Sequence, residues 1–209
     1  MEPLVDNLET ILGEYKGLLA SMLGEKRLAH CTNAAFVAYE LAVDSGEDGC
    51  SAFKAALVHD IAKEMTLEEQ TSWAEKSPVA VPEYAYGSRH RLHGFAAAGY
   101  LFETRKDFSA EELEAIAFHT IGRPDMVSLD MIVYCADKIE PGRGDDYAHY
   151  LPLWKSLVLK DRGKALPSLT AAIMRDLIEK NKRRGVECPE GIEINKRLVV
   201  LLQALETRI

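Results

Sequence analysis

Apolar residues recur at steps of three and four along almost the whole chain, and this periodicity restricts the fold more than any other feature. The first stripe begins at Leu4 and ends near Gly24, as in an amphipathic helix. Capping-box patterns start two more helices, at Thr66 and at Ser109. Further helices are expected from Arg89 onward and over 26–43, 51–64, 128–138, 147–160, 167–184 and 191–206.

No segment alternates polar and apolar residues in the way that a half-buried strand does, and no internal repeat is evident. The 209 residues are enough for one large domain that buries about 70% of the surface of its unfolded chain. The sequence therefore predicts an all-α, single-domain helical bundle of about nine to ten helices. We expect residues 1–25 to form an N-terminal helix on the core, 26–145 the core, and 146–209 C-terminal helices that complete the same domain.

Charge and composition exclude several classes of partner. The net charge of -8 argues against binding to nucleic acid or to an anionic membrane surface, because both need a basic face. The four cysteines are far apart and form no C-x-x-C pair, so neither a zinc knuckle nor a redox motif is indicated. The acidic N-terminus differs from a secretory signal, and no apolar run approaches about 18 residues. A cytoplasmic protein is expected.

A histidine and an aspartate interrupt the apolar run that begins at Ala55. If the run is helical, His59, Asp60 and Lys63 can all face one cavity, since residues three and four apart share a helix face. Polar groups inside a core cost about 2–7 kcal/mol unless they are satisfied, and a metal ion would satisfy them. A single His-Asp pair in an acidic protein can also be a coincidence.

Further histidines and one aspartate lie in or beside other apolar helical patterns, and together with His59 and Asp60 they supply four imidazoles and two carboxylates. These are His30, His93, His119 and Asp137. Each histidine taken alone could be a satisfied core residue, and His90 could replace His93, being three residues away on the same helix. Imidazoles combined with carboxylates suit iron, manganese or other first-row metals better than calcium or magnesium.

The order and spacing of these six residues resemble the HD-domain superfamily of metal-dependent phosphohydrolases, in the version that carries two metals. Local sequences are more specific and resemble the bacterial YqeK family, whose members are symmetrical diadenosine tetraphosphate hydrolases. The matching segments are His59-Asp60-Ile61-Ala62-Lys63, His93-Gly94, 115–122 and 134–143. The chain departs from the family at four positions where tryptophan, proline, tyrosine and serine are common, namely Leu92, Phe95, Lys138 and Val127.

The resemblance implies a role for each candidate residue. His30, His59, Asp60 and Asp137 would hold one metal, and His93, His119 and Asp60 the other, with iron the first expectation and manganese the second. Asp60, Lys63 and Arg143 would be catalytic, the two cations by balancing charge on the substrate. The residues expected to bind substrate are Arg27, Lys63, Thr120, Arg123, Glu140 and Arg143.

The implied reaction is attack by a hydroxide on the dinuclear metal centre at a dinucleoside polyphosphate. A symmetrical cut of diadenosine tetraphosphate would give two nucleoside diphosphates, although nothing in the spacing fixes the position of the cut. One alternative is an HD-type nucleotidase that acts on mononucleotides or guanosine tetraphosphate. Another is a non-catalytic nucleotide-binding or assembly factor. A small nucleotide is the expected partner, and dimerisation is left open.

Overall fold

The computed structural model describes residues 2–183 and 189–209, and within them it contains ten α-helices, two short 3₁₀ helices and no strand. The all-α fold expected from the apolar periodicity is confirmed. The α-helices are α1 (Glu2–Met22), α2 (Glu25–Ser45), α3 (Gly49–Val58), α4 (Leu67–Ala74), α5 (Arg89–Thr104), α6 (Ala110–Phe118), α7 (Ser128–Ile139), α8 (Asp145–Lys160), α9 (Arg162–Arg183) and α10 (Pro189–Glu206). The 3₁₀ helices are η1 (Glu83–Ala85) and η2 (Pro141–Arg143).

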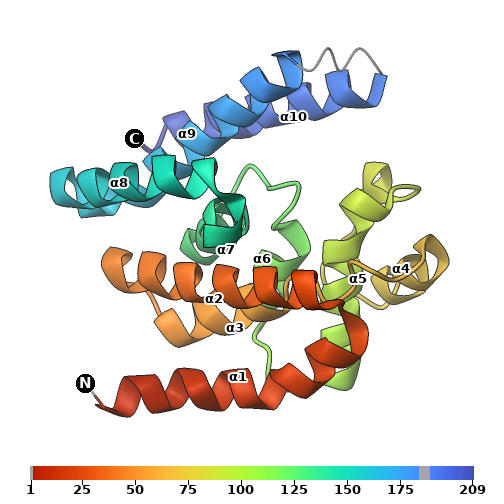
Figure 1. Cartoon of the computed structure of the whole chain (residues 1–209). Helices are drawn as coiled ribbons and strands as arrows, with labels where there is room; N and C mark the ends of the chain where they lie inside the picture. Colours follow the sequence, from red (N-terminus) through yellow and green to blue (C-terminus); the bar gives the residue numbers. More distant parts are fainter. Residues whose placement is uncertain (1, 184–188) are drawn as a thin grey trace.

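The helices pack in layers around α2, α3 and α7 (Figure 1). Helix α1 covers one side of the α2–α3 pair, and α8, α9 and α10 lie on the opposite side, beyond α7 (Figure 1). Buried apolar side chains from all of these layers join one continuous core, which includes Tyr15 of α1, Phe53 of α3, Leu169 of α9 and Leu201 of α10. A single domain requires one shared core of this kind. The division of the domain into residues 1–25, 26–145 and 146–209 stays a prediction.

Both expected capping boxes are present. The hydroxyls of Thr66 and Ser109 accept hydrogen bonds from the backbone N–H groups of Glu69 and Glu112, whose carboxylates accept the N–H groups of the capping residues in return. Across the described helices, none is long and apolar enough to cross a membrane.

Small residues on α5 allow two close helix contacts. A Cβ atom on Gly94 would lie 2.5 Å from the carbonyl oxygen of Ala117, and one on Gly99 would lie 1.9 Å from that of Trp73. Both distances are far below contact distance, so only glycine fits. The first contact brings the histidine beside Gly94 up to the end of α6.

The helix expected over 51–64 is wrong at its C-terminal end, because α3 ends at Val58 and the following residues form turns. The His59 ring Nδ1 donates to the carbonyl of Ala56, 2.6 Å away, which supplies a side-chain bond where the helix stops. Helix α6 ends in the same way, with His119 Nδ1 donating to the carbonyl of Ile116 at 2.7 Å. His59 and Lys63 therefore do not share a helix face.

Candidate metal centre and substrate cavity

The structure brings all six predicted ligand side chains together at the centre of the bundle, from five separate parts of the chain. The imidazole rings follow one another, with centroids 5.2 Å apart for His30 and His59, 4.7 Å for His59 and His119, and 4.8 Å for His119 and His93. Asp60 is 1% exposed and lies among them. Helix α2 carries His30, α5 carries His93, α7 carries Asp137, and the others follow α3 and α6.

Hydrogen bonds at the outer nitrogen fix the orientation of every ring. Each Nδ1 faces a carbonyl or carboxylate oxygen, and such oxygens only accept, so Nδ1 must carry the proton. The neutral ring then presents an unprotonated Nε2, the form in which histidine binds a metal. The pairs are His30 with Glu140 at 3.1 Å, His59 with Ala56 at 2.6 Å, His93 with Arg89 at 3.2 Å and His119 with Ile116 at 2.7 Å.

The two oxygens of Asp60 face two different pairs of histidines. Oδ1 lies 3.0 Å from His93 Nε2 and 3.5 Å from His119 Nε2. Oδ2 lies 3.6 Å from His59 Nε2 and 3.8 Å from His30 Nε2. One carboxylate thus stands between two groups of nitrogen ligands.

Asp137 lies nearest to the group of His30 and His59, although its ligand atoms also lie within 4.8 Å of those of His59 and His119. Its Oδ1 lies 3.1 Å from His30 Nε2 and 3.7 Å from His59 Nε2. The family resemblance likewise implied that Asp137 would bind the same metal as His30 and His59. Potential ligand atoms of these residues lie within 4.8 Å of one another in sets of three, such as Asp60, His93 and His119.

Several buried atoms at this centre lack the partner that burial requires. Within the described part of the chain, His30 Nε2, His59 Nε2 and Asp60 Oδ1 make no hydrogen bond. An unsatisfied buried polar atom costs about 1–3 kcal/mol. The Nε2 atoms of His93 and His119 face each other at 3.0 Å. A cation among these lone pairs would satisfy them, so the donor set fits a first-row metal ion.

Burial and charge set the protonation states that metal binding needs. Burial lowers the pKa of His119 to about 3 and also lowers that of His93, so both rings are neutral at pH 7. Burial would raise the pKa of Asp60, but His59 and the other imidazoles outweigh it and hold that pKa well below its usual range. Burial lowers the pKa of His59, yet Asp60 and Asp137 raise it by more. The local field therefore attracts positive charge.

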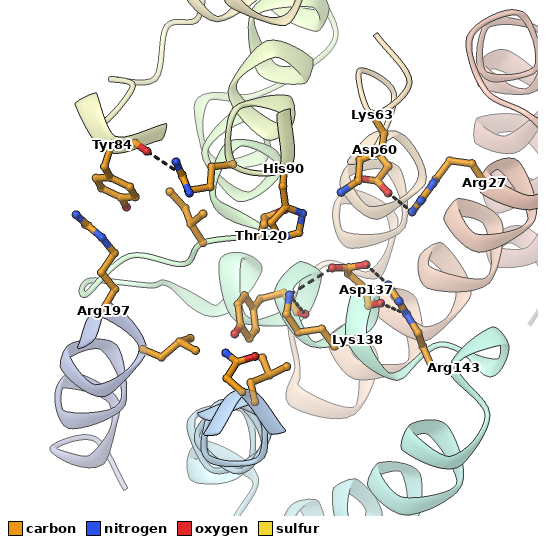
Figure 2. A pocket seen from close by; sticks show the side chains of 16 residues that line it. Arg27, Asp60, Lys63, Tyr84, His90, Thr120, Asp137, Lys138, Arg143 and Arg197 are labelled. Carbon is orange, nitrogen blue, oxygen red and sulfur yellow. Dashed lines mark hydrogen bonds and ion pairs between the residues drawn. The ribbon is translucent and has the colours of Figure 1, made fainter. Parts of the chain in front are cut away.

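Four cationic side chains flank the carboxylates on the open side of the centre. Arg27 Nη1 lies 2.7 Å from Asp60 Oδ2, and Lys63 Nζ lies 3.6 Å from Asp60 Oδ1. Arg143 Nη2 lies 2.9 Å from Asp137 Oδ1, and Lys138 Nζ lies 3.3 Å from Asp137 Oδ2. All six residues line one cavity of about 730 Å³. Figure 2 shows Arg27 and Arg143 pointing toward the two carboxylates from one side of it.

Comparison with known proteins identifies the family. The family model described as "HD domain" matches residues 27–142, more than half of the chain. The chain belongs to the HD domain family. All six candidate ligands lie inside this HD segment, which begins at Arg27 and ends just before Arg143.

Named relatives of this HD protein are bacterial. The chain is 34% identical over 131 residues to "Bis(5'-nucleosyl)-tetraphosphatase, symmetrical" of Bacillus subtilis, covering 62% of this chain and 69% of the relative. It is also 34% identical over 128 residues to "Probable nicotinate-nucleotide adenylyltransferase/Ap4A hydrolase" of Mycoplasma pneumoniae, covering 61% of this chain. The chain spans about a third of that relative, 36% of its length. These matches confirm the resemblance that the motifs predicted.

A solved structure shares the fold of this HD protein over nearly its full length. It is described as a predicted HD superfamily hydrolase involved in NAD metabolism from Clostridium acetobutylicum. The TM-score is 0.67 at 28% identity, and the match covers 93% of this chain and 96% of the other. The likeness therefore includes the C-terminal helices, which lie outside the HD segment.

Two residues expected to bind substrate do not line the cavity. The Arg123 guanidinium forms ion pairs with Glu114 at 2.7 Å and Asp130 at 2.8 Å, which hold it on α6 and α7. Glu140 is 3% exposed and lies behind His30, where it accepts the Nδ1 proton of that ring. The geometry therefore gives no support to substrate binding by Arg123 or Glu140, and both roles stay predictions. The other four, Arg27, Lys63, Thr120 and Arg143, line the cavity, and their roles in substrate binding also stay predictions.

Sequence reasoning missed part of the cavity wall. Lys138 adjoins a ligand in the sequence and could have been included on that ground. His90 had been considered only as an alternative metal ligand. The side chains from α9 and α10 carry no local signal, because these helices are brought to the HD segment only by tertiary packing. The additional lining residues are Tyr84, His90, Arg91, Ile121, Tyr134, Leu177, Asn181, Arg197 and Leu198.

Proposed function

We propose that this protein is a metal-dependent phosphohydrolase that cleaves a dinucleoside tetraphosphate symmetrically into two nucleoside diphosphates. The observation that carries the proposal is the convergence of six inward-facing ligand side chains at the cationic end of one cavity. The names of the relatives from Bacillus subtilis and Mycoplasma pneumoniae favour diadenosine tetraphosphate as the substrate.

The residues present fit two metal ions. His30, His59, Asp60 and Asp137 would hold one ion, and His93, His119 and Asp60 the other, since the two oxygens of Asp60 face the two histidine pairs. Iron is the first choice and manganese the second on the family resemblance, and the imidazole-rich donor set suits both. When bound, such ions supply Lewis acidity toward phosphoryl oxygens and activate water as a nucleophile.

The protein's own cations would bind and orient the polyphosphate. Arg27, Lys63 and Arg143 line the cavity beside the carboxylates, and their charges reverse the negative field that the overall charge of -8 would otherwise present to an anion. The planar guanidinium groups can each donate two parallel hydrogen bonds to a phosphate. These three residues would also balance the charge that develops on the leaving diphosphate.

Thr120 and Lys63 hold the second histidine pair in place from the cavity side. The Thr120 hydroxyl lies 2.9 Å from His119 Nε2 and 3.2 Å from His93 Nε2, and Lys63 Nζ lies 3.1 Å from His93 Nε2. The same Nε2 atoms would bind a metal. A bound metal would replace the Thr120 hydroxyl and the Lys63 ammonium at these nitrogens, and both groups could then contact the substrate.

The test is product analysis on the full chain loaded with iron or manganese. We expect diadenosine tetraphosphate to give ADP alone. AMP with ATP would refute the symmetrical cut, and turnover of mononucleotides or guanosine tetraphosphate instead would show a nucleotidase. Nucleotide binding without turnover by any metal-loaded form would show a non-catalytic protein.

The ligand assignment is tested with His59→Ala and Asp60→Ala. Both substitutions should abolish turnover and reduce the metal content measured by elemental analysis. Asp60→Ala should remove more metal than His59→Ala, because only Asp60 contacts both histidine pairs. Full activity in either variant would show that the centre is misplaced.

A further inference from the structure

The cavity has two chemically different ends. Near Asp60 and Asp137 the walls carry four cations beside the two carboxylates, whereas the opposite side carries the Tyr84 ring with Arg197 stacked on it, away from both carboxylates (Figure 2). A cavity of about 730 Å³ is far larger than a phosphate group needs and matches the size of a small-molecule site. A ligand that fills it can therefore place an anionic part at the first end and a second part against the Tyr84 end.

Tyr84 and Arg197 form a flat surface at this second end. The Arg197 guanidinium carbon lies 3.2 Å from the centroid of the Tyr84 ring, which is stacking distance. Arg91 Nε donates to the carbonyl oxygen of Tyr84 at 2.8 Å and so fixes the backbone that carries the ring. Aromatic rings and guanidinium planes are the surfaces on which proteins stack nucleobases.

The wall next to this surface is apolar. Leu177 of α9, Leu198 of α10 and Ile121 line the same cavity as Tyr84. An apolar wall beside a stacking surface suits the planar, uncharged base of a nucleotide.

We propose that the end of the cavity formed by Tyr84, Arg197 and the C-terminal helices holds the base of the nucleotide substrate, with Tyr84 as the residue on which the base stacks. The inference rests on the proposed function, since it assumes a nucleotide whose phosphates lie at the metal end. The base site lies partly outside the HD segment: α9 and α10 supply one wall of it.

The experiment compares a ligand that has a base with one that lacks it. ADP and inorganic pyrophosphate are titrated by calorimetry into the manganese-loaded full chain. Tyr84→Leu removes the ring, Tyr84→Phe retains it, and Tyr86→Leu is the matched control. Tyr86 is 38% exposed, lies two residues away and does not line the cavity.

Tyr84→Leu should weaken ADP binding by about fivefold to a hundredfold, which is the range for loss of one stacked base, and leave pyrophosphate binding unchanged. Tyr84→Phe and Tyr86→Leu should bind both ligands like the wild type. An equal loss for both ligands, or unchanged ADP binding by Tyr84→Leu, would overturn the inference, as would failure of the wild type to bind ADP more tightly than pyrophosphate.

The two proposals fail in different ways. If the wild type binds ADP through Tyr84 but does not hydrolyse diadenosine tetraphosphate, the base site stands and the proposed reaction falls. If the wild type produces ADP alone while Tyr84→Leu retains the wild-type KM for the dinucleotide, the reaction stands and the base site falls.

Discussion

Glu140→Gln tests whether the metal centre depends on the hydrogen bond behind His30. Glu140 accepts three hydrogen bonds with two oxygens: Oε1 from His30 Nδ1 at 3.1 Å, and Oε2 from Asn33 Nδ2 at 3.1 Å and the Gly142 N–H at 2.6 Å. Glutamine has the same shape but only one acceptor oxygen. Keeping that oxygen on Asn33 and Gly142 satisfies two donors, so the amide NH₂ is left facing His30.

The consequence for His30 follows from the two nitrogens of its ring. An NH₂ group in front of Nδ1 forces that nitrogen to accept, and the ring proton then moves to Nε2, which points into the centre. The ring can no longer bind a metal through Nε2. Loss of such a partner typically weakens metal binding by about 10- to 100-fold, or about 1.4 to 2.8 kcal/mol.

The assay is competition for manganese between a chelator and metal-stripped protein. Glu112→Gln is the matched control, because Glu112 is also buried and accepts hydrogen bonds from Ser51 at 2.9 Å and from the Ser109 N–H at 2.8 Å, but it contacts no candidate ligand. Both variants should lose some thermal stability, and only Glu140→Gln should lose metal affinity. Wild-type affinity in Glu140→Gln, or an equal loss in Glu112→Gln, would refute the reasoning.

Three further predictions concern stability and are checked by thermal unfolding. Gly99→Ala should cost about 3 kcal/mol or more, since its Cβ would lie 1.9 Å from a backbone oxygen, whereas Gly17→Ala on the open face of α1 should stabilise by about 0.5–1 kcal/mol. Val127→Ser should stabilise α7 by about 1 kcal/mol, because Val127 is its 43%-exposed N-cap and lacks an oxygen to accept a backbone N–H. Burial raises the pKa of Asp107, but the Tyr15 hydroxyl and nearby cations lower this pKa by more. Ionised Asp107 therefore stabilises the fold at pH values above its unfolded pKa, which is near 4. This contribution is lost as the pH falls further. Asp107→Asn should therefore show a smaller fall in melting temperature between pH 5 and pH 3 than the wild type does; an equal fall in both would contradict this.

The helices could be predicted from the sequence because each has its own local signal. Capping at Thr66 and Ser109 located the starts of α4 and α6, whereas α9 begins at Arg162, five residues before the expected position 167. The end of α3 could not be predicted, because the side chain of His59 bonds back to the carbonyl of Ala56 and only the folded geometry shows this. The error did not affect the ligand set, since the turn still places Asp60 at the centre.

The convergence of the candidate ligands could be predicted because each is a polar residue embedded in an apolar pattern, where burial without a partner is costly. Cationic residues carry no such signal. Arg27 and Arg123 both lie beside candidate ligands in the sequence, yet one reaches Asp60 and the other pairs with Glu114 and Asp130. Which carboxylate a surface arginine meets depends on tertiary packing, so substrate contacts were harder to predict than metal ligands.

The candidate metal ligands and several of the residues proposed to contact the base also lie in different parts of the chain. The candidate metal ligands lie within residues 27–142, and the HD family shares this segment. Leu177, Arg197 and Leu198 lie beyond it, on helices that complete the opposite wall of the cavity. With the proposed base site, substitutions in α9 and α10 should change which nucleoside is accepted without disturbing the imidazoles, because none of the six candidate ligands lies on either helix. A hydrolytic centre of fixed composition can in this way serve different nucleotides, if the base stacks where Tyr84 meets Arg197.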